Sequence, residues 1–242
     1  MALQDWWSAR FDTWLFNHLA GIATVTDTRL TGFNSTLSPD ATHIVYAGAA
    51  TAESNLSANS TQTFALEIID KAVLAARTVT PVIRPLNNEQ EPGKHNFVGF
   101  ITPEHHYDLR RSTGTGEYQD IQKYALSANA SGKNPILSGS IGVYNGVVLH
   151  ETIRLPEVAG AVASTVGRGV ICGAQAATLA WGRGYSKTRM SWAEKLFDYD
   201  NQLGVKTGVI GGLQKNRYNN ADFATMVMSA CHSVAARAAS QR

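Results

Sequence analysis

The sequence has little cysteine, no long apolar run and almost no net charge. Its two cysteines, Cys172 and Cys231, lie far apart, which argues against a disulfide framework and fits synthesis in a reducing compartment. No stretch approaches the ~20 apolar residues of a membrane span, and the first residues lack the basic and apolar regions of a signal peptide. A formal net charge of +2 gives no global attraction to nucleic acid or membrane. We therefore expect no membrane partner and no disulfide-stapled fold.

Catalytic motifs are also missing, although isolated pieces of them occur. His150 begins a His-Glu pair, but a zinc-protease motif needs a second histidine four residues later on a helix, and that position is Arg154. His105 and His106 are neighbours on a predicted helix, where side chains point about 100° apart. The G-x-G of residues 114–116 lacks the Lys-Ser/Thr of a phosphate loop. We expect no catalytic residue, cofactor or metal, and a metal-dependent hydrolase using the three histidines is a much weaker alternative.

The composition is that of an ordinary globular protein. Hydrophobic residues make up 44% and charged residues 17% of the 242 positions. This length suffices to bury a core as one large domain or two small ones. Helical and extended patterns both occur along the chain, so we expect an α+β protein.

The first segment has the clearest helical pattern, and Gly21 follows it as a stop. Its apolar residues recur at steps of three and four, which predicts a helix with one face packed against a core. The residues of that predicted packing face are Leu3, Trp6, Trp7, Phe11, Trp14, Leu15 and Leu19.

The next part of the chain predicts a surface segment followed by alternating helices and strands. Residues 24–63 are rich in Ser, Thr, Asn, Ala and Gly, which is typical of a long surface excursion. A helix capped by Thr63 should follow. Residues 95–102 read as a buried strand, and Thr102 with Pro103 is a strong helix start. Another helix is expected over residues 117–126.

A β-hairpin is predicted around Asn145 and Gly146. This dipeptide is the strongest short hairpin signal and lies between the strand-like segments SIGVY and VVLHETIRL. Beyond residue 167 the chain is rich in small residues and reads as further strands with polar turns, ending in a polar tail.

Basic residues gather in the last third of the sequence. The segment from Arg168 to Arg217 contains eight basic residues and three acidic ones. Two interpretations stay open: a surface that faces a polyanion or an acidic neighbouring subunit, or a solvated face. The candidate subunit or DNA contacts are Arg168, Arg183, Lys187, Arg189, Lys206, Lys215 and Arg217.

Five segments together carry a resemblance to one family, in order and with similar spacing. They read ALQDWWSARFDTWLFNHLAG, FVGFITPEHHYDLRRSTGTGEYQDIQKYAL, NPILSGSIGVYNGVVLHETIRLP, VICGAQAATLAWGRG and WAEKLFDYDNQLGVKTGVIGGLQKNRYNNADFATMVM. Each segment alone is a weak signal, whereas the ordered set spans nearly the whole chain. The sequence resembles the tailed-phage major capsid proteins typified by coliphage N-four.

The resemblance implies the Johnson fold, named for phage Hong Kong ninety-seven. Residues 1–22 would then be the spine helix of a peripheral domain, residues 23–166 mainly an axial domain, and residues 167–242 peripheral strands and a tail. The implied function is self-assembly, through pentamers and hexamers, into the icosahedral head shell that encloses double-stranded DNA. Portal, scaffold and decoration proteins are implied partners, and the implied location is the virion, after assembly in the bacterial cytoplasm.

Two segments that the family carries are expected to be missing here, and one alternative function stays open. Members carry an N-terminal arm and an extended E-loop before the spine helix, and we expect both to be absent from this sequence. The same fold also builds cellular shells, so an encapsulin or a gene-transfer particle is the alternative function. The family has no catalytic residues to transfer, in agreement with the missing motifs.

Overall fold

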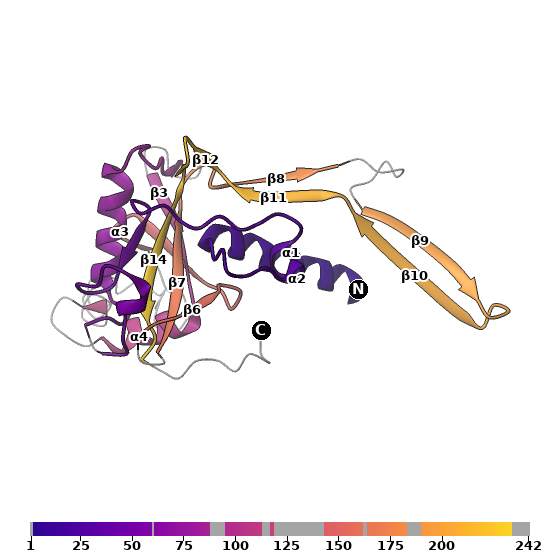
Figure 1. Ribbon diagram of the computed structural model, residues 1–242, viewed down its shortest axis with the longest axis horizontal. Helices are drawn as coiled ribbons and strands as arrows, with labels where there is room; N and C mark the ends of the chain where they lie inside the picture. Colours follow the sequence, from indigo (N-terminus) through magenta and orange to yellow (C-terminus); the bar gives the residue numbers. More distant parts are fainter. Residues whose placement is uncertain are drawn as a thin grey trace, which may run out of the picture.

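The computed structural model describes residues 2–59, 61–87, 95–112, 117–118, 143–161, 164–182 and 190–233. A mixed sheet with helices forms one end of an elongated molecule, and a two-stranded ribbon projects at the other (Figure 1). The combination of helices with mostly antiparallel strands agrees with the expected α+β class. No helix in these described ranges is long and apolar enough to cross a bilayer.

The sheet joins strands from the beginning, middle and end of the chain. Its order is β1-β14-β7-β3-β5-β4, with β2 added to β3 and β6 added to β7. The pairs β1/β14 and β3/β5 are parallel, and the other pairs are antiparallel. The strands are β1 (Ile44–Tyr46), β2 (Leu86–Asn87), β3 (His95–Ile101), β4 (Val143–Tyr144), β5 (Val147–Glu151), β6 (Glu157–Ala159), β7 (Thr165–Cys172) and β14 (Thr225–Cys231).

The two central strands, β7 and β14, are buried along almost their whole length. Strands covered on both faces read as continuous apolar runs rather than as alternating ones. One core cluster packs around helix α3 and includes Phe97, Ile171 and Met226. A second cluster packs around helix α1 and includes Phe16 and Val170. The helices on the two faces therefore account for the burial of these strands.

Helices α3 (Leu66–Thr78) and α4 (Pro103–Arg111) flank the sheet. The predicted α4 start is confirmed, because the Thr102 hydroxyl accepts a hydrogen bond from the His105 backbone N–H at 3.2 Å. The predicted cap of α3 is wrong. Thr63 forms a parallel bridge with Cys231 beside the sheet, and α3 begins only after Ala65, which makes no side-chain cap.

The expected surface excursion over residues 24–63 is only partly correct. The segment contains a short helix α2 (Thr28–Thr31), β1 and a 3-10 turn η1 (Glu53–Asn55). It also contributes buried residues, because β1 adds to the sheet edge beside β14 and brings its flanking loops inward. The buried residues include Thr31, Thr36, His43, Ala47 and Leu56.

Helix α1 (Ala2–Ala20) ends, as predicted, at Gly21, which has a φ of 67°. The predicted core face is wrong for its first half. Leu3 and Trp6 are 40% and 48% exposed, because this half extends beyond the sheet. Only the last turns, with residues such as Leu19, pack into the core. The remaining members of the predicted face, Trp7, Phe11, Trp14 and Leu15, are half-buried.

The ribbon follows β7 and returns to β14. Strands β8 (Ala177–Trp181) and β11 (Gly211–Lys215) pair at its base, and β9 (Met190–Phe197) and β10 (Gln202–Val209) form the projecting part. A short pair, β12 (Arg217–Tyr218) and β13 (Ala221–Asp222), leads back to the sheet. Strands β7 and β14 pair with each other, and β7 also pairs with β3, so strands from both sides of residue 167 share one sheet. The expected domain limits stay a prediction.

The predicted hairpin is confirmed between β4 and β5. Asn145 and Gly146 have φ angles of 45° and 75°, as a two-residue turn with two left-handed positions requires. Asp70 of α3 accepts hydrogen bonds from Tyr144 Oη at 2.9 Å and Asn145 Nδ2 at 2.8 Å. These bonds hold the turn against the helix. The predicted helix over 117–126 and the G-x-G of 114–116 lie largely outside the described residues.

Replacing Gly146 by alanine should destabilise the protein by about 1–2 kcal/mol, because a side chain is disfavoured in the left-handed region. An added Cβ has room, with its nearest neighbours at 3.9 Å, so the cost comes from the backbone. Urea unfolding of Gly146→Ala against the parent measures it. Gly208→Ala, at a ribbon glycine without positive φ, is the control, and its added Cβ meets only the Ser191 hydroxyl, at 2.9 Å, which can rotate away. Unchanged stability in Gly146→Ala would show that the turn is not constrained.

Candidate assembly surface

Arg168 lies in the middle of β7 and joins three elements. Its guanidinium donates to both Glu53 carboxylate oxygens, at 2.6 and 2.7 Å. It also donates to the carbonyl oxygens of Ala20 and Gly21, at 2.8 and 2.9 Å, where α1 ends. A cation suits this position, since the carbonyl end of a helix carries partial negative charge. Arg168 therefore fixes the end of α1 and the η1 turn to the sheet.

Glu53 stays ionised in this pair. Burial by itself raises its pKa, but the hydrogen bonds and charge of Arg168, with the Ser229 hydroxyl at 2.7 Å, outweigh burial and lower the pKa below the ordinary 4.5. The pair is nearly closed to solvent. Removing the charge of either Arg168 or Glu53 would leave the other charge buried without a partner.

A second buried ion pair closes the base of the ribbon. Lys215 Nζ and Arg217 Nε donate to the two oxygens of Asp222, each at 2.7 Å. The Asp222 backbone N–H donates a hydrogen bond to the Asp40 carboxylate at 2.8 Å. Burial lowers the pKa of Lys215, although the Asp222 charge opposes that effect. These contacts fix β11 to the segment that returns to the sheet.

The prediction of a basic contact surface is thus wrong for two of its members, since Arg168 and Lys215 are buried. Arg217 is half-buried and paired with Asp222, and its part in contacts stays a prediction. The sequence could not reveal this, because Glu53 lies more than a hundred residues away from its partner. Lys206 is exposed on the ribbon, as expected. Arg183, Lys187 and Arg189 lie outside the described residues.

The histidines singled out in the sequence do not converge. His105 is buried and stacks on Phe64, while His106 Nδ1 contacts Glu151 Oε2 at 2.6 Å. His150 lies beside Phe100. Among the described residues, the structure instead gathers a trio that the sequence did not reveal, Glu104, Glu157 and His232, whose possible metal-ligating atoms lie within 4.8 Å of one another. The absence of a bound metal stays a prediction.

The projecting ribbon has one apolar face that is open to solvent. Alternate residues of β9 and their partners on β10 share a face, because side chains alternate along a strand. The opposite face carries mostly small and polar residues, including Lys195 and Lys206. Trp192 and Leu203 are 59% and 62% exposed. The apolar members are Met190, Trp192, Leu196, Leu203, Val205 and Val209.

Helix α1 touches the base of this apolar face. Trp7 Nε1 donates to Thr207 Oγ1 at 2.7 Å, and Thr207 is the register partner of Trp192. Phe11 meets Trp181 edge-on at a ring separation of 5.2 Å. The aromatic half of α1 thus lies beside the ribbon, and both carry exposed apolar side chains, such as Trp6 and Leu203. Soluble monomers rarely expose such patches, which usually mark contact sites.

Comparisons with known proteins agree on one family. Residues 1–234 match a family model described as phage capsid protein. A search of curated proteins gives no match. The capsid of Ralstonia phage GP4 is similar to the chain at 28% identity with a TM-score of 0.76, over 98% of this chain and 67% of that one. This likeness supports the phage-capsid fold that the resemblance implied.

Two more distant structures share the fold. The capsid of Helicobacter pylori bacteriophage KHP30 aligns at 16% identity with a TM-score of 0.63, over 95% of this chain and 67% of that one. The cyanophage Pam1 capsid asymmetric unit aligns at 20% identity with a TM-score of 0.59. This chain covers 50% of the Pam1 chain, so it spans between half and two thirds of the chains that it matches.

Replacing Arg168 by methionine should cost about 3–5 kcal/mol of unfolding free energy, because Glu53 would stay buried without a partner. Denaturant unfolding of Arg168→Met measures the loss. Lys206→Met, at an exposed position, should change stability by no more than about 0.5 kcal/mol. The double variant Glu53→Met/Arg168→Met should recover most of the loss. A cost below about 1 kcal/mol in the single variant would contradict the assigned role.

The free energy of unfolding should also fall at acid pH, because Glu53 becomes protonated there. Its folded-state pKa lies below the unfolded value of 4.5, so its contribution is complete above that pH and is lost as pH falls through the lower, folded value. Thermal unfolding between pH 7 and pH 3 should show the loss, and Glu53→Gln should show a smaller one. The same pH dependence in both proteins would be the opposite outcome.

Proposed function

We propose, from the premise that this chain belongs to the phage capsid protein family, that it builds the head shell of a tailed phage by packing the apolar face of its ribbon against neighbouring copies. The family match over residues 1–234 and the likeness to the GP4 capsid support a structural role as major capsid protein in the virion. The chain is accordingly a structural protein, and we infer that it has no enzymatic activity.

The exposed ribbon face is the observation that carries this proposal. Burying apolar surface stabilises by roughly 25 cal/mol per Å², and large apolar side chains such as Trp192, Leu196 and Leu203 remain in water in the single chain. The ribbon projects well beyond the sheet (Figure 1), where a neighbour can cover it. A partner of the same kind is the natural occupant, since capsid proteins assemble from many copies of one chain.

The same architecture supports a proposed division into axial and peripheral parts. We infer that the sheet with α3 and α4 corresponds to the axial part, which surrounds the centres of pentamers and hexamers. Helix α1 and the ribbon would then be the peripheral part, joined to the sheet by Arg168 and by the ion pair of Lys215 with Asp222.

Packaged double-stranded DNA is a proposed non-specific partner. The exposed Lys195 and Lys206 lie on the ribbon face opposite the apolar one. Lysines make phosphate contacts without base readout, so such binding should weaken steeply with salt. Portal, scaffold and decoration proteins would meet the shell as further partners, and assembly would take place in the cytoplasm of the bacterial host.

The apolar face should control self-association. Trp192→Ser and Leu203→Ser should each weaken association about tenfold or more, because each removes roughly 1.5–3 kcal/mol of apolar burial. Sedimentation velocity and electron microscopy of the purified chain give oligomer size and particle yield. Ala193→Ser, an exposed position on the opposite face, is the matched control. Strictly monomeric parent protein at high concentration, or equal association of all variants, would contradict the proposal.

A further inference from the structure

The tip of the ribbon combines two carboxylates with a fully exposed aromatic ring. Asp198, Tyr199 and Asp200, followed by Asn201, connect β9 to β10, and the Tyr199 side chain has no cover at all, with 104% relative exposure. All three residues have φ angles between 50° and 69°, a region that costs energy for residues other than glycine. No ion pair engages either aspartate within the described part of the chain. The tip therefore presents two free negative charges and one phenol.

A groove elsewhere on the molecule has the complementary chemistry. It encloses about 420 Å³ between α1, α2 and the loop that joins β5 to β6. Three arginines line it, together with the apolar side chains of Trp6 and Ile153. Arg10 stacks against the Trp6 and Trp14 rings, with its Cζ at 4.9 and 5.4 Å from their centroids.

The arginines of the groove are only partly satisfied. Arg29 pairs with Asp27 at 2.9 Å. Arg154 makes one long side-chain contact, to Thr13 Oγ1 at 3.4 Å, and the Arg10 Nε atom is buried with no hydrogen-bond partner. Among the described residues, neither Arg10 nor Arg154 has a carboxylate within ion-pair distance. Glu157 is the one acidic residue of the lining, so the groove keeps a net positive charge.

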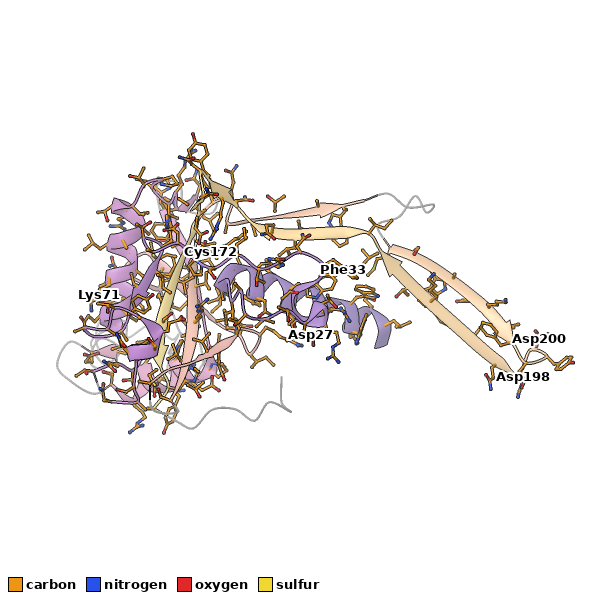
Figure 2. The ribbon with its side chains drawn as sticks, viewed as in Figure 1. Asp27, Phe33, Lys71, Cys172, Asp198 and Asp200 are labelled. Atoms are coloured by element: carbon orange, nitrogen blue, oxygen red, sulfur yellow. The ribbon has the colours of Figure 1, made fainter. Side chains whose placement is uncertain are left out.

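The tip and the groove of one molecule are far apart. Figure 2 shows Asp198 and Asp200 at the outer end of the ribbon, whereas Asp27, the partner of Arg29, lies beside α1 in the middle of the molecule. The tip can therefore reach only the groove of another molecule. Such a contact joins two different patches, so it repeats from copy to copy and builds a ring where the rotation between copies closes.

We propose that the ribbon tip of one copy docks in this groove of a neighbouring copy, with Tyr199 between the apolar walls and the two aspartates on Arg10 and Arg154. Charge complementarity selects this partner and orientation, and buried Tyr and Arg are the side chains that most often dominate interface affinity. The inference rests on the proposed function, because it requires that copies of the chain associate. It adds which surface receives the tip.

Site-specific cross-linking tests the docking directly. The full chain carrying benzoylphenylalanine in place of Tyr199 is assembled as a mixture of isotopically light and heavy molecules, irradiated and mapped by mass spectrometry. Light-to-heavy cross-links from position 199 should reach residues 6–17, 25–30 or 153–157. The same probe at Tyr218, an exposed tyrosine beside the base of the ribbon, should not reach them.

The outcomes separate the docking from the function on which it rests. Oligomers whose position-199 cross-links map to other residues would overturn the docking and leave shell formation intact. A parent chain that never associates would overturn both. Adducts to a copurified molecule at the groove, in place of a second copy, would show another occupant and also overturn the docking.

A charge exchange gives a second, independent test. Asp198→Asn/Asp200→Asn keeps residues that tolerate the left-handed region and should weaken association at least tenfold, whereas Asp12→Asn on the exposed side of α1 should not. Asp200→Arg and Arg154→Glu should each weaken association, and the two together should restore part of the loss. Full association of the double-asparagine variant, or no recovery in the exchanged pair, would overturn the proposal.

Discussion

The architecture depends on one buried guanidinium. Arg168 is inserted from a central strand between a carboxylate and the carbonyl end of α1, and it uses hydrogen bonds to both. A buried charge in this position is tolerated only because the Glu53 carboxylate and the carbonyl oxygens of α1 accept its hydrogen bonds. The orientation of α1 relative to the sheet, and of the ribbon that rests on α1 through Trp7 and Phe11, follows from this anchor.

This anchor divides the molecule into a closed part and an open part. On one side, α3, α4 and the sheet enclose a continuous core in which β7 and β14 are buried. On the other side, the first half of α1 and the ribbon expose aromatic and aliphatic side chains. A globular enzyme would bury this surface or use it to line a site, whereas a shell subunit needs it for its neighbours. The same division agrees with the membership of the chain in the phage capsid protein family.

Local patterns in the sequence were sufficient for elements whose signals are local. Thr102 with Pro103 predicts the start of α4, Gly21 the end of α1, and Asn145 with Gly146 the hairpin, because caps and turns are determined by neighbouring residues. The wrong predictions concern long-range contacts. Arg168 looks like a surface cation until Glu53 is placed beside it.

Amphipathic patterns likewise identified the apolar faces without saying what covers them. The periodicity of α1 predicts one apolar face, and it gives no indication that Leu3 and Trp6 lie beyond the sheet. The alternation in β9 and β10 is equally regular, although side chains of its apolar face such as Trp192 and Leu203 stay exposed. The family could be recognised because an ordered set of segments carries more information than any one of them. The surface proposed for assembly could be identified only from the structure.

Hydrogen–deuterium exchange on free and assembled protein tests the central claim most directly, that the ribbon is the surface covered by neighbouring copies. Backbone amides of residues 190–209 should gain protection on assembly, while those of the buried strands 165–172 and 225–231 should exchange equally slowly in both states, since they are already closed in the single chain. Unchanged exchange over residues 190–209 in assembled particles would contradict the account.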